Sequence, residues 1–133
     1  MHITGGCHCG HVTYEAELDP QRVVICHCSD CQKLTGSPFR VTAVVPDNDL
    51  KVTGEPRMYK RVADSGRVRQ QYFCPECGSQ LFVNGEGEVS KIWGVRWGSI
   101  DQRMDVKPQR QGWCRSAPAW LSEIAELPAR EKD

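Results

Sequence analysis

The chain has 133 residues, with 17 basic and 17 acidic side chains and a formal net charge of zero. This length fits a single domain, and the lack of a basic excess argues against a general nucleic-acid binder. No apolar run approaches the roughly 20 residues of a membrane span, so no membrane partner is expected. We expect one domain over 1–133, with a core over about 5–127 and a loose C-terminal tail.

Short strands are predicted through the first half of the chain. Residues 12–18 alternate apolar and polar side chains, as a half-buried strand does, and the β-branched run 23–25 leads into a cysteine-rich segment. A short helix is expected to run to Leu34 and to stop at Gly36. Alternation returns over 39–45 and predicts another strand.

The second half continues with short strands, separated by turns rich in glycine, proline and aspartate. The predicted strands cover residues 50–53, 58–62, 68–73, 80–83, 92–97 and 104–107. Pro118 precedes a short C-terminal helix, which has Trp120, Ile124 and Leu127 at helical spacing. This pattern predicts a mainly β fold of short antiparallel strands with one or two short helices.

Three thiols lie within six residues, at Cys26, Cys28 and Cys31. Side chains at i and i+2 of an extended backbone point the same way, and a turn after Ser29 would bring Cys31 back to the other two. Three sulfurs leave one over in any disulfide pairing, whereas zinc binds thiolates in a tetrahedron at about 2.3 Å. Three protein ligands leave a fourth position open, as in catalytic zinc sites.

Two further cysteine pairs each supply half of a four-sulfur site. They are Cys7-x-Cys9 and the knuckle Cys74-x-x-Cys77, and pairs so far apart in sequence commonly share one structural zinc. An alternative partition joins the three-cysteine group to the knuckle and leaves the first pair over. Both partitions remain open from the residues alone.

The remaining candidates have simpler interpretations. Cys114 is expected to be a small buried hydrophobe. His8 and His27 lie inside the C-x-C pairs, where an extended backbone turns them away from the metal, so we expect them to support the ligands or face solvent. Trp93 and Trp97 are expected to pack in the core rather than form a substrate platform.

The compartment follows from the N-terminus and the cysteines. Residues 1–7 lack the charged and apolar regions of a signal peptide. In a reducing compartment, clustered cysteines are more often metal ligands than disulfides, so we expect a cytoplasmic protein. Basic residues cluster over 57–69 and 96–115, and we expect both clusters to be solvated surface.

Several segments together resemble one known family. They are Cys7-His8-Cys9-Gly10, Cys26-His27-Cys28-Ser29-Asp30-Cys31, Gly36-Ser37-Pro38-Phe39, Phe73-Cys74-Pro75-Glu76-Cys77-Gly78-Ser79 and Gly98-Ser99-Ile100-Asp101. In order and spacing they are similar to the glutathione-dependent formaldehyde-activating enzyme family, also called the centromere protein V family. The resemblance implies a β-tent fold with two zinc ions per chain. It places a structural zinc on Cys7, Cys9, Cys74 and Cys77, and a catalytic zinc on Cys26, Cys28 and Cys31.

The activity that the resemblance implies is that of a zinc-dependent carbon–sulfur lyase, similar to S-(hydroxymethyl)glutathione synthase. Its substrates would be adducts of glutathione, or a similar small thiol, with formaldehyde or another small aldehyde. An open zinc could hold the substrate thiol as a thiolate or polarise the aldehyde oxygen, and arginines could bind glutathione carboxylates. The oligomeric state remains open, and an oligomer is compatible with the sequence.

The rival hypothesis is a non-catalytic zinc-binding module with a structural or protein-interaction role. The feature that separates the two is the fourth position of the second zinc site. A vacant position facing a pocket favours an enzyme, whereas a fourth protein ligand, such as His27 or Cys114, favours a structural module.

Overall fold

The computed structural model describes residues 1–133, apart from the side chain of Asp47. Its strands are β1 (His2–Gly6), β2 (Thr13–Glu17), β3 (Val23–Cys26), β4 (Arg40–Pro46), β5 (Leu50–Thr53), β6 (Arg57–Val62), β7 (Val68–Phe73), β8 (Gln80–Asn84), β9 (Ile92–Arg96) and β10 (Arg110–Gly112). The α-helix is α1 (Ser29–Thr35). Short 3-10 helices cover Asp47–Asp49, Gly87–Lys91, Trp97–Ser99, Arg103–Asp105, Cys114–Ser116 and Ala119–Glu126. The predicted mainly β class is confirmed.

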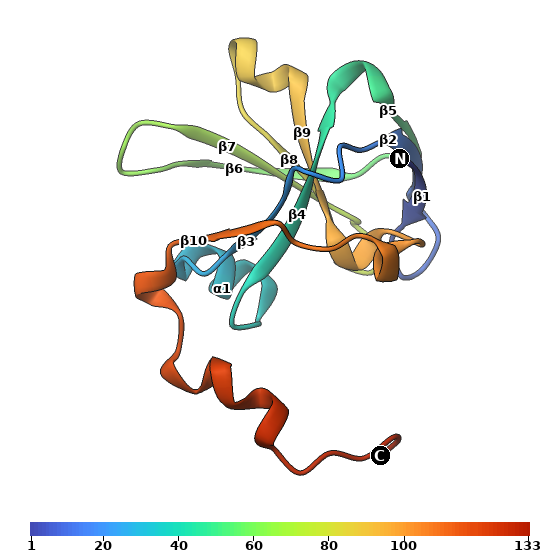
Figure 1. Cartoon of the computed structure of the whole chain (residues 1–133). Coiled ribbons are helices and arrows are strands. Elements are labelled where there is room, and N and C mark those ends of the chain that lie inside the picture. The colour runs from blue at the N-terminus through green and yellow to red at the C-terminus, as the bar shows by residue number, and fades with distance from the viewer.

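The strands form two sheets (Figure 1). The smaller sheet has the order β1-β2-β5, and the larger has the order β10-β3-β4-β9-β8-β7-β6. All neighbouring strands are antiparallel except β10 and β3, which are parallel. The antiparallel order agrees with the sequence prediction for all but this last strand.

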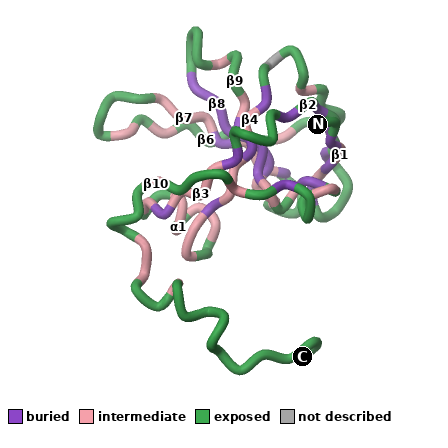
Figure 2. Tube along the Cα trace, viewed as in Figure 1, coloured by how far each residue is buried: buried purple, intermediate pink, exposed green. Residues whose placement is uncertain are grey.

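The core lies where the two sheets meet (Figure 2). In β2, Tyr14 and Ala16 are buried while Thr13, Glu15 and Glu17 are exposed, so the strand turns one face toward the core. The Tyr14 ring meets Phe82 of β8 edge-on, with ring centroids 5.1 Å apart. Trp93 also packs against this core, as predicted.

Cysteine chemistry and helix capping coincide at the start of α1. The Cys28 sulfur accepts a hydrogen bond from the Cys31 N–H at 3.3 Å, which caps the helix. The helix ends at Gly36, whose φ of 63° is the left-handed conformation that glycine adopts without strain. This short helix therefore holds Cys28 and Cys31 in a fixed relation to the end of β3.

The N-terminal strand is fixed against the loop that follows β9. Gly5 pairs with Ile100, and a Cβ at Gly5 would collide with the Ser99 carbonyl oxygen and the Tyr14 hydroxyl. The Thr4 hydroxyl also donates to the Asp101 carboxylate at 2.8 Å. The strand that leads to Cys7 is therefore anchored at a position where only glycine fits.

The structure corrects some of the predicted elements. Residues 104–107 were expected to form a strand, but a 3-10 helix covers Arg103–Asp105 because the N–H groups of Asp105 and Val106 bond back to the carbonyls three residues earlier. β1 and β10 were not predicted. The C-terminal helix exists over Ala119–Glu126, but it is a 3-10 helix without a buried residue.

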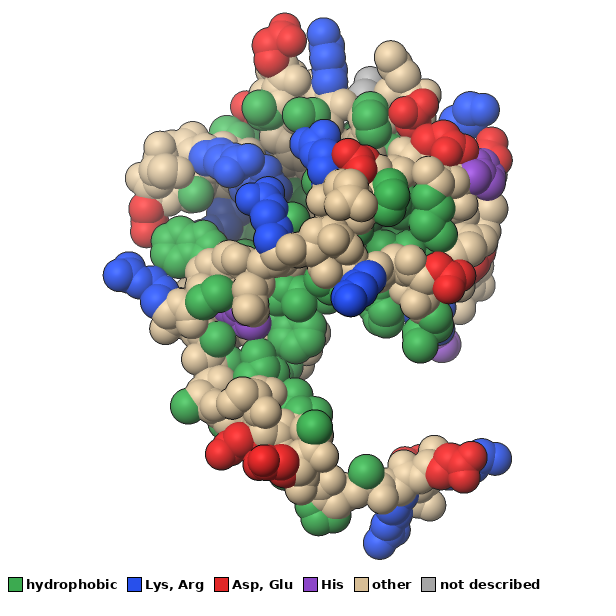
Figure 3. Space-filling view, in the orientation of Figure 1, with side chains coloured by type: hydrophobic (Ala, Val, Ile, Leu, Met, Phe, Trp, Pro, Cys, Tyr) green, Lys and Arg blue, Asp and Glu red, His purple; other side chains and the backbone are tan. Residues whose placement is uncertain are grey.

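The last part of the chain leaves the body as an extended arm (Figure 1). Its large apolar side chains are exposed, among them Trp113, Trp120, Ile124 and Leu127, and Figure 3 shows hydrophobic side chains along its length. Within the described part of the chain, the helices are all too short or too polar to cross a bilayer.

Candidate metal centres

The first candidate centre brings together two loops from opposite parts of the chain. Cys7 and Cys9 come from the β1–β2 connection, and Cys74 and Cys77 come from the β7–β8 connection; their sulfurs all lie within 4.8 Å of one another. The Cys9 sulfur is 3.7 Å from that of Cys7 and 3.8 Å from that of Cys74. A tetrahedron of sulfurs at the usual zinc distance has edges of about 3.8 Å, so these spacings fit a tetrahedral metal.

Donors around the four-sulfur group favour thiolates. The Val12 N–H donates to the Cys7 sulfur at 3.2 Å. The Ser79 hydroxyl accepts from the His8 N–H at 3.0 Å and lies 3.2 Å from the Cys77 sulfur, to which it can donate. These interactions from Ser79, first its hydroxyl and then its N–H, lower the pKa of Cys77 to about 5. These donors therefore favour the thiolate form of Cys77, which is the form that binds a cation.

The second candidate centre holds Cys26, Cys28 and Cys31, whose sulfurs also lie within 4.8 Å of one another. All three are half-buried. Burial, followed by the neighbouring thiols, raises the pKa of Cys26 to about 12. Burial alone would raise the pKa of Cys28 too, but the N–H of Cys31 and the adjacent thiols bring it below its usual value. Without a metal, negative charge is therefore favoured on Cys28 over Cys26.

Two buried arginines lie beside the three-cysteine group. Arg40, which is 5% exposed, donates through Nη2 to the Cys31 sulfur at 3.4 Å. Its Nη1 donates to Gln71 Oε1 at 3.2 Å and to Gln80 Oε1 at 3.1 Å. Arg96, which is 8% exposed, donates to the same Gln71 oxygen at 2.6 Å. The Gln71 oxygen therefore bridges the two guanidinium groups, and Gln80 binds only Arg40, the arginine that contacts the sulfur group.

The environment of Arg96 disfavours its charge. Burial, and then the positive charge of Arg40, lower its pKa well below the usual value, while the nearby Cys31 thiol acts in the opposite direction. The prediction that the 96–115 basic cluster is solvated surface is therefore wrong for Arg96. Arg40 was not singled out from the sequence, because nothing in its local pattern separates it from an ordinary strand residue.

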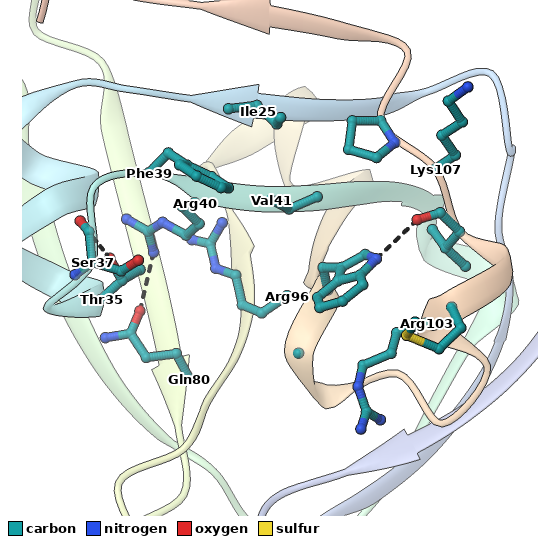
Figure 4. Close-up of a pocket in the computed structure, with 15 residues that line it drawn as sticks. Ile25, Thr35, Ser37, Phe39, Arg40, Val41, Gln80, Arg96, Arg103 and Lys107 are labelled. Atoms are coloured by element: carbon teal, nitrogen blue, oxygen red, sulfur yellow. Dashed lines mark hydrogen bonds between the residues drawn. The ribbon is translucent and has the colours of Figure 1, made fainter. Parts of the chain in front are cut away.

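A cavity of about 690 Å³ opens beside these arginines (Figure 4). Apolar side chains make up much of its wall, and Arg40, Arg96, Arg103 and Lys107 supply its charges. In Figure 4 the guanidinium groups of Arg40 and Arg96 lie together near Thr35 and Ser37, while Arg103 and Lys107 lie at the other end. Arg40, which contacts the Cys31 sulfur, lines this cavity, so a small molecule could enter beside the three-cysteine group.

The other residues singled out from the sequence lie partly near the site and partly on the surface. His27 is buried, and its Nε2 pairs with Gln111 Oε1 at 2.9 Å, so it belongs to neither sulfur group. His8 is exposed. Cys114 is exposed rather than buried, because the arm that carries it leaves the core. Trp97 packs against the core as predicted but also lines the cavity, with its Nε1 donating to the Val106 carbonyl at 2.8 Å.

The donor sets suit a soft divalent metal. Thiolates select zinc and similar ions over magnesium or calcium, and the short sulfur–sulfur distances fit such an ion in the four-sulfur group. In the three-cysteine group, no fourth His, Cys, Asp or Glu of the described residues joins the three sulfurs. The two groups thus offer one complete and one incomplete coordination shell.

Comparison with known proteins identifies a matching family and several similar proteins. A family model described as "Glutathione-dependent formaldehyde-activating enzyme" matches residues 2–116. Three fungal relatives carry that enzyme name as a provisional assignment. The one from Emericella nidulans is 37% identical over 84 residues (62% of this chain), the one from Podospora anserina is 38% identical over 63 residues (47%), and the one from Penicillium rubens is 35% identical over 78 residues (57%). The matched stretches span 42%, 29% and 40% of these relatives' lengths, which is less than half in each case.

A solved structure confirms the fold. A crystal structure of a Rhodobacter sphaeroides protein superimposes with a TM-score of 0.63, covering 81% of this chain and 98% of that one, at 22% sequence identity. At this identity the likeness concerns the fold alone. The family match extends over most of the chain and includes all seven cysteines of the two sulfur groups. The chain therefore belongs to the glutathione-dependent formaldehyde-activating enzyme family.

Proposed function

We propose that this protein binds two zinc ions and acts as a carbon–sulfur lyase on the adduct of glutathione, or a similar small thiol, with formaldehyde or another small aldehyde. The observation that carries the proposal is the incomplete sulfur group of Cys26, Cys28 and Cys31, which lies beside a cavity of about 690 Å³. The family to which the chain belongs, and the names of its relatives, support the same reaction class.

The four-sulfur group would hold the structural zinc. Its ligands join loops that are 65 residues apart, as in the pair Cys9 and Cys74. Four thiolates complete the tetrahedral shell of zinc, so a ligand could enter only by displacing a cysteine. We therefore assign no catalytic step to Cys7, Cys9, Cys74 or Cys77.

The three-cysteine group would hold the second zinc and leave one position for a ligand. Bound there, zinc would supply the charge that keeps a substrate thiol deprotonated at neutral pH. The chain fixes the geometry of this site through α1, whose first turn bonds the Cys28 sulfur. Arg40 adds positive charge through its contact with Cys31, which stabilises anionic sulfur further.

The proposed reaction balances without an oxidant or reductant. The thiol of glutathione loses its proton, and the sulfur forms a bond to the carbonyl carbon of formaldehyde. The carbonyl π electrons move to the oxygen, which takes up a proton. The product is the hemithioacetal S-(hydroxymethyl)glutathione, and the reverse reaction breaks the same carbon–sulfur bond.

The rival is a non-catalytic zinc-binding module with a structural or protein-interaction role. It would be favoured by a fourth protein ligand at the second centre. His27 pairs with Gln111 instead, and Cys114 is exposed on the arm. Both observations support the enzyme over the rival.

Two broader expectations accompany the proposal. Residues 1–133 would form one domain with its core over about 5–127. The protein would work in the cytoplasm, where reduced glutathione keeps such thiols free of disulfides.

The first experiment compares two ligands by calorimetric titration of the zinc-loaded protein. Glutathione can lose its thiol proton, whereas S-methylglutathione cannot. We expect glutathione to bind at least about tenfold more tightly, a difference of about 1.4 kcal/mol, and this preference to disappear in Cys28→Ser but not in Cys114→Ser. Equal affinity of the wild-type protein for both ligands would overturn the thiolate mechanism.

The second experiment measures the reaction itself. Nuclear magnetic resonance exchange with ¹³C-formaldehyde and glutathione gives the rate at which the adduct forms and breaks. We expect the zinc-loaded protein to raise this rate and Cys28→Ser to leave it at the uncatalysed value. If the wild-type protein binds glutathione but does not change the exchange rate, the result favours a non-catalytic zinc-binding module over an enzyme.

A further inference from the structure

The arm of residues 113–133 exposes apolar surface that its own body does not cover. No residue of the helix Ala119–Glu126 is buried, and Trp120, Ile124 and the following Leu127 are 51%, 49% and 59% exposed. Figure 3 shows a hollow between the arm and the body, with hydrophobic side chains on both sides of it. Apolar side chains gathered on one exposed segment in this way mark an interaction surface.

The total surface of the chain supports the same conclusion. The chain exposes 8791 Å², whereas a compact monomer of 15.0 kDa exposes about 7,000 Å². The excess of about 1,700 Å² is larger than the roughly 800 Å² that each partner contributes to a standard protein interface. Covering the arm would therefore bury enough surface for a stable dimer.

The arm leaves the body in a fixed direction. The side-chain amide of Gln32 donates to the Ser116 carbonyl and to the His27 carbonyl, both at 3.0 Å, so it ties the start of the arm to the three-cysteine segment. Pro118 follows with an extended backbone, and the proline ring fixes its φ. The arm is therefore a formed element that points away from its own body.

The helix of the arm presents an apolar line beside an acidic one. In a 3-10 helix every third side chain lies on the same line, so Leu121 and Ile124 are aligned and Leu127 continues their line. Glu123 and Glu126 lie together on a neighbouring line. Runs of 3-10 helix longer than about four residues are uncommon, whereas this one has eight. Packing of the apolar line against another surface would stabilise it.

The cavity of about 690 Å³ offers a complementary surface. Its wall is mainly apolar, and Met104 on that wall is 84% exposed. Arg103 and Lys107 also line it, are exposed, and form no salt bridge with the side chains that the structure describes. Their charged ends lie apart in Figure 4, so each can meet a different carboxylate.

We propose that the arm is a dimerisation arm, which packs across the cavity mouth of a second copy of this chain while the partner's arm does the same in return. The apolar line of the arm covers the apolar wall, and its two glutamates meet the two exposed cations. Because the exchange is reciprocal, both copies use the same surfaces, as a two-fold symmetric dimer requires. Each copy then supplies part of the cavity wall of the other, whatever reaction takes place there.

Sedimentation equilibrium of the zinc-loaded full chain measures the assembly directly. We expect a particle of twice the 15.0 kDa chain mass, which dissociates on dilution as mass action requires. The double variant Ile124→Asp/Leu127→Asp places charges on the exposed apolar line and should raise the dimer Kd at least about hundredfold. Circular dichroism checks that the variant is folded. A wild-type chain that is monomeric at all concentrations, or a dimer that survives in this variant, would overturn the proposal.

A matched control shows that the effect belongs to the arm. Val52 and Val62 are 40% and 58% exposed, and neither lies on the arm or in the cavity wall. Val52→Asp/Val62→Asp therefore adds the same charge elsewhere on the surface and should leave the dimer Kd unchanged. An equal rise of Kd in the control and in the arm variant would count against the arm as the interface.

Reversing charges tests the docking face. The variants Arg103→Glu/Lys107→Glu and Glu123→Lys/Glu126→Lys should each weaken their own dimer at least about tenfold at low salt, because like charges then meet. Mixing the two variants should restore a Kd close to that of the wild type, since opposite charges face each other at both contacts of the mixed dimer. An arm that folded back on its own body would not be rescued by mixing. A mixed pair that associates no better than either variant alone would overturn the assigned face.

Discussion

The two sulfur groups use the same ligand chemistry in opposite surroundings. The four-sulfur group of Cys7, Cys9, Cys74 and Cys77 joins two distant loops, and its neighbours are backbone N–H groups and a serine hydroxyl. The group of Cys26, Cys28 and Cys31 comes from one short segment, and its neighbours are buried arginines and a cavity.

The surroundings of a sulfur group therefore decide what it can do. A complete shell between distant loops contributes its binding energy to folding, because the loops are held together only when the metal is bound. An incomplete shell on a local turn contributes little to folding and leaves the metal accessible to a ligand. A closed and an open centre should therefore respond differently to mutation, to chelation and to pH.

The largest expected effect is on stability. Cys74→Ser should lower the free energy of unfolding by more than about 3 kcal/mol, or roughly 10 °C in Tm, because it breaks the site that joins the two loops. Cys28→Ser should cost less than about 1 kcal/mol, since serine can replace the sulfur as the cap of α1. Thermal unfolding by circular dichroism measures both, with Cys114→Ser as control. Equal melting temperatures for Cys74→Ser and Cys28→Ser would remove the distinction.

The two metals should also differ in how easily they leave. Brief treatment with a moderate chelator should remove about one equivalent of zinc per chain, since a three-sulfur shell exchanges more readily than a four-sulfur one. Circular dichroism should show an intact fold at that point, and the second equivalent should leave only as the protein unfolds. Simultaneous loss of both metals together with the fold would contradict the account.

Arg40 should affect the zinc affinity of the three-cysteine centre only. Arg40→Gln removes the donor to the Cys31 sulfur and should weaken zinc binding there roughly tenfold, the lower end of what such outer contacts contribute. Arg40→Lys retains the charge and should recover part of the loss. Competition with a chromophoric chelator gives the affinities, with the exposed Arg57→Gln as control. An unchanged affinity in folded Arg40→Gln would show that Arg40 has no such role.

A smaller effect concerns pH. A free thiol has a pKa of about 8.5, so a ligand that binds as thiolate must release a proton at neutral pH. Glutathione affinity should therefore fall by up to roughly tenfold for each unit below that value, while S-methylglutathione affinity stays flat over the same range. Calorimetry between pH 8 and pH 6 checks this, and parallel pH profiles for the two ligands would contradict it.

The sequence predicts the cysteine groups well because their signals are local. C-x-C and C-x-x-C spacings bring sulfurs together through the backbone alone, as the cap of α1 by Cys28 illustrates. Strands such as β2 and β4 are also predictable, because alternation of apolar and polar residues marks them. Which sulfur pair joins which loop depends on the whole fold, and the residues alone left two partitions open.

The rest of the site depends on strand pairing, which leaves no local signal. Arg40 and Arg96 are 56 positions apart and meet because β4 pairs with β9, where Thr42 faces Arg96. β10 is short and polar, so no periodicity reveals it. Cys114 was expected to be buried because of its residue type. It is exposed because the arm that carries it packs against too little of the body to bury it.

The central claim is that the three-cysteine centre has a vacant position for a thiol. The most direct test uses the selenium analogue of glutathione, kept reduced, with X-ray absorption measured at the selenium edge of the zinc-loaded complex. The account predicts a zinc neighbour of selenium at bonding distance in the wild-type protein and in Cys114→Ser, and none in Cys28→Ser. A bound analogue whose selenium has only carbon neighbours in the wild-type protein would contradict the account.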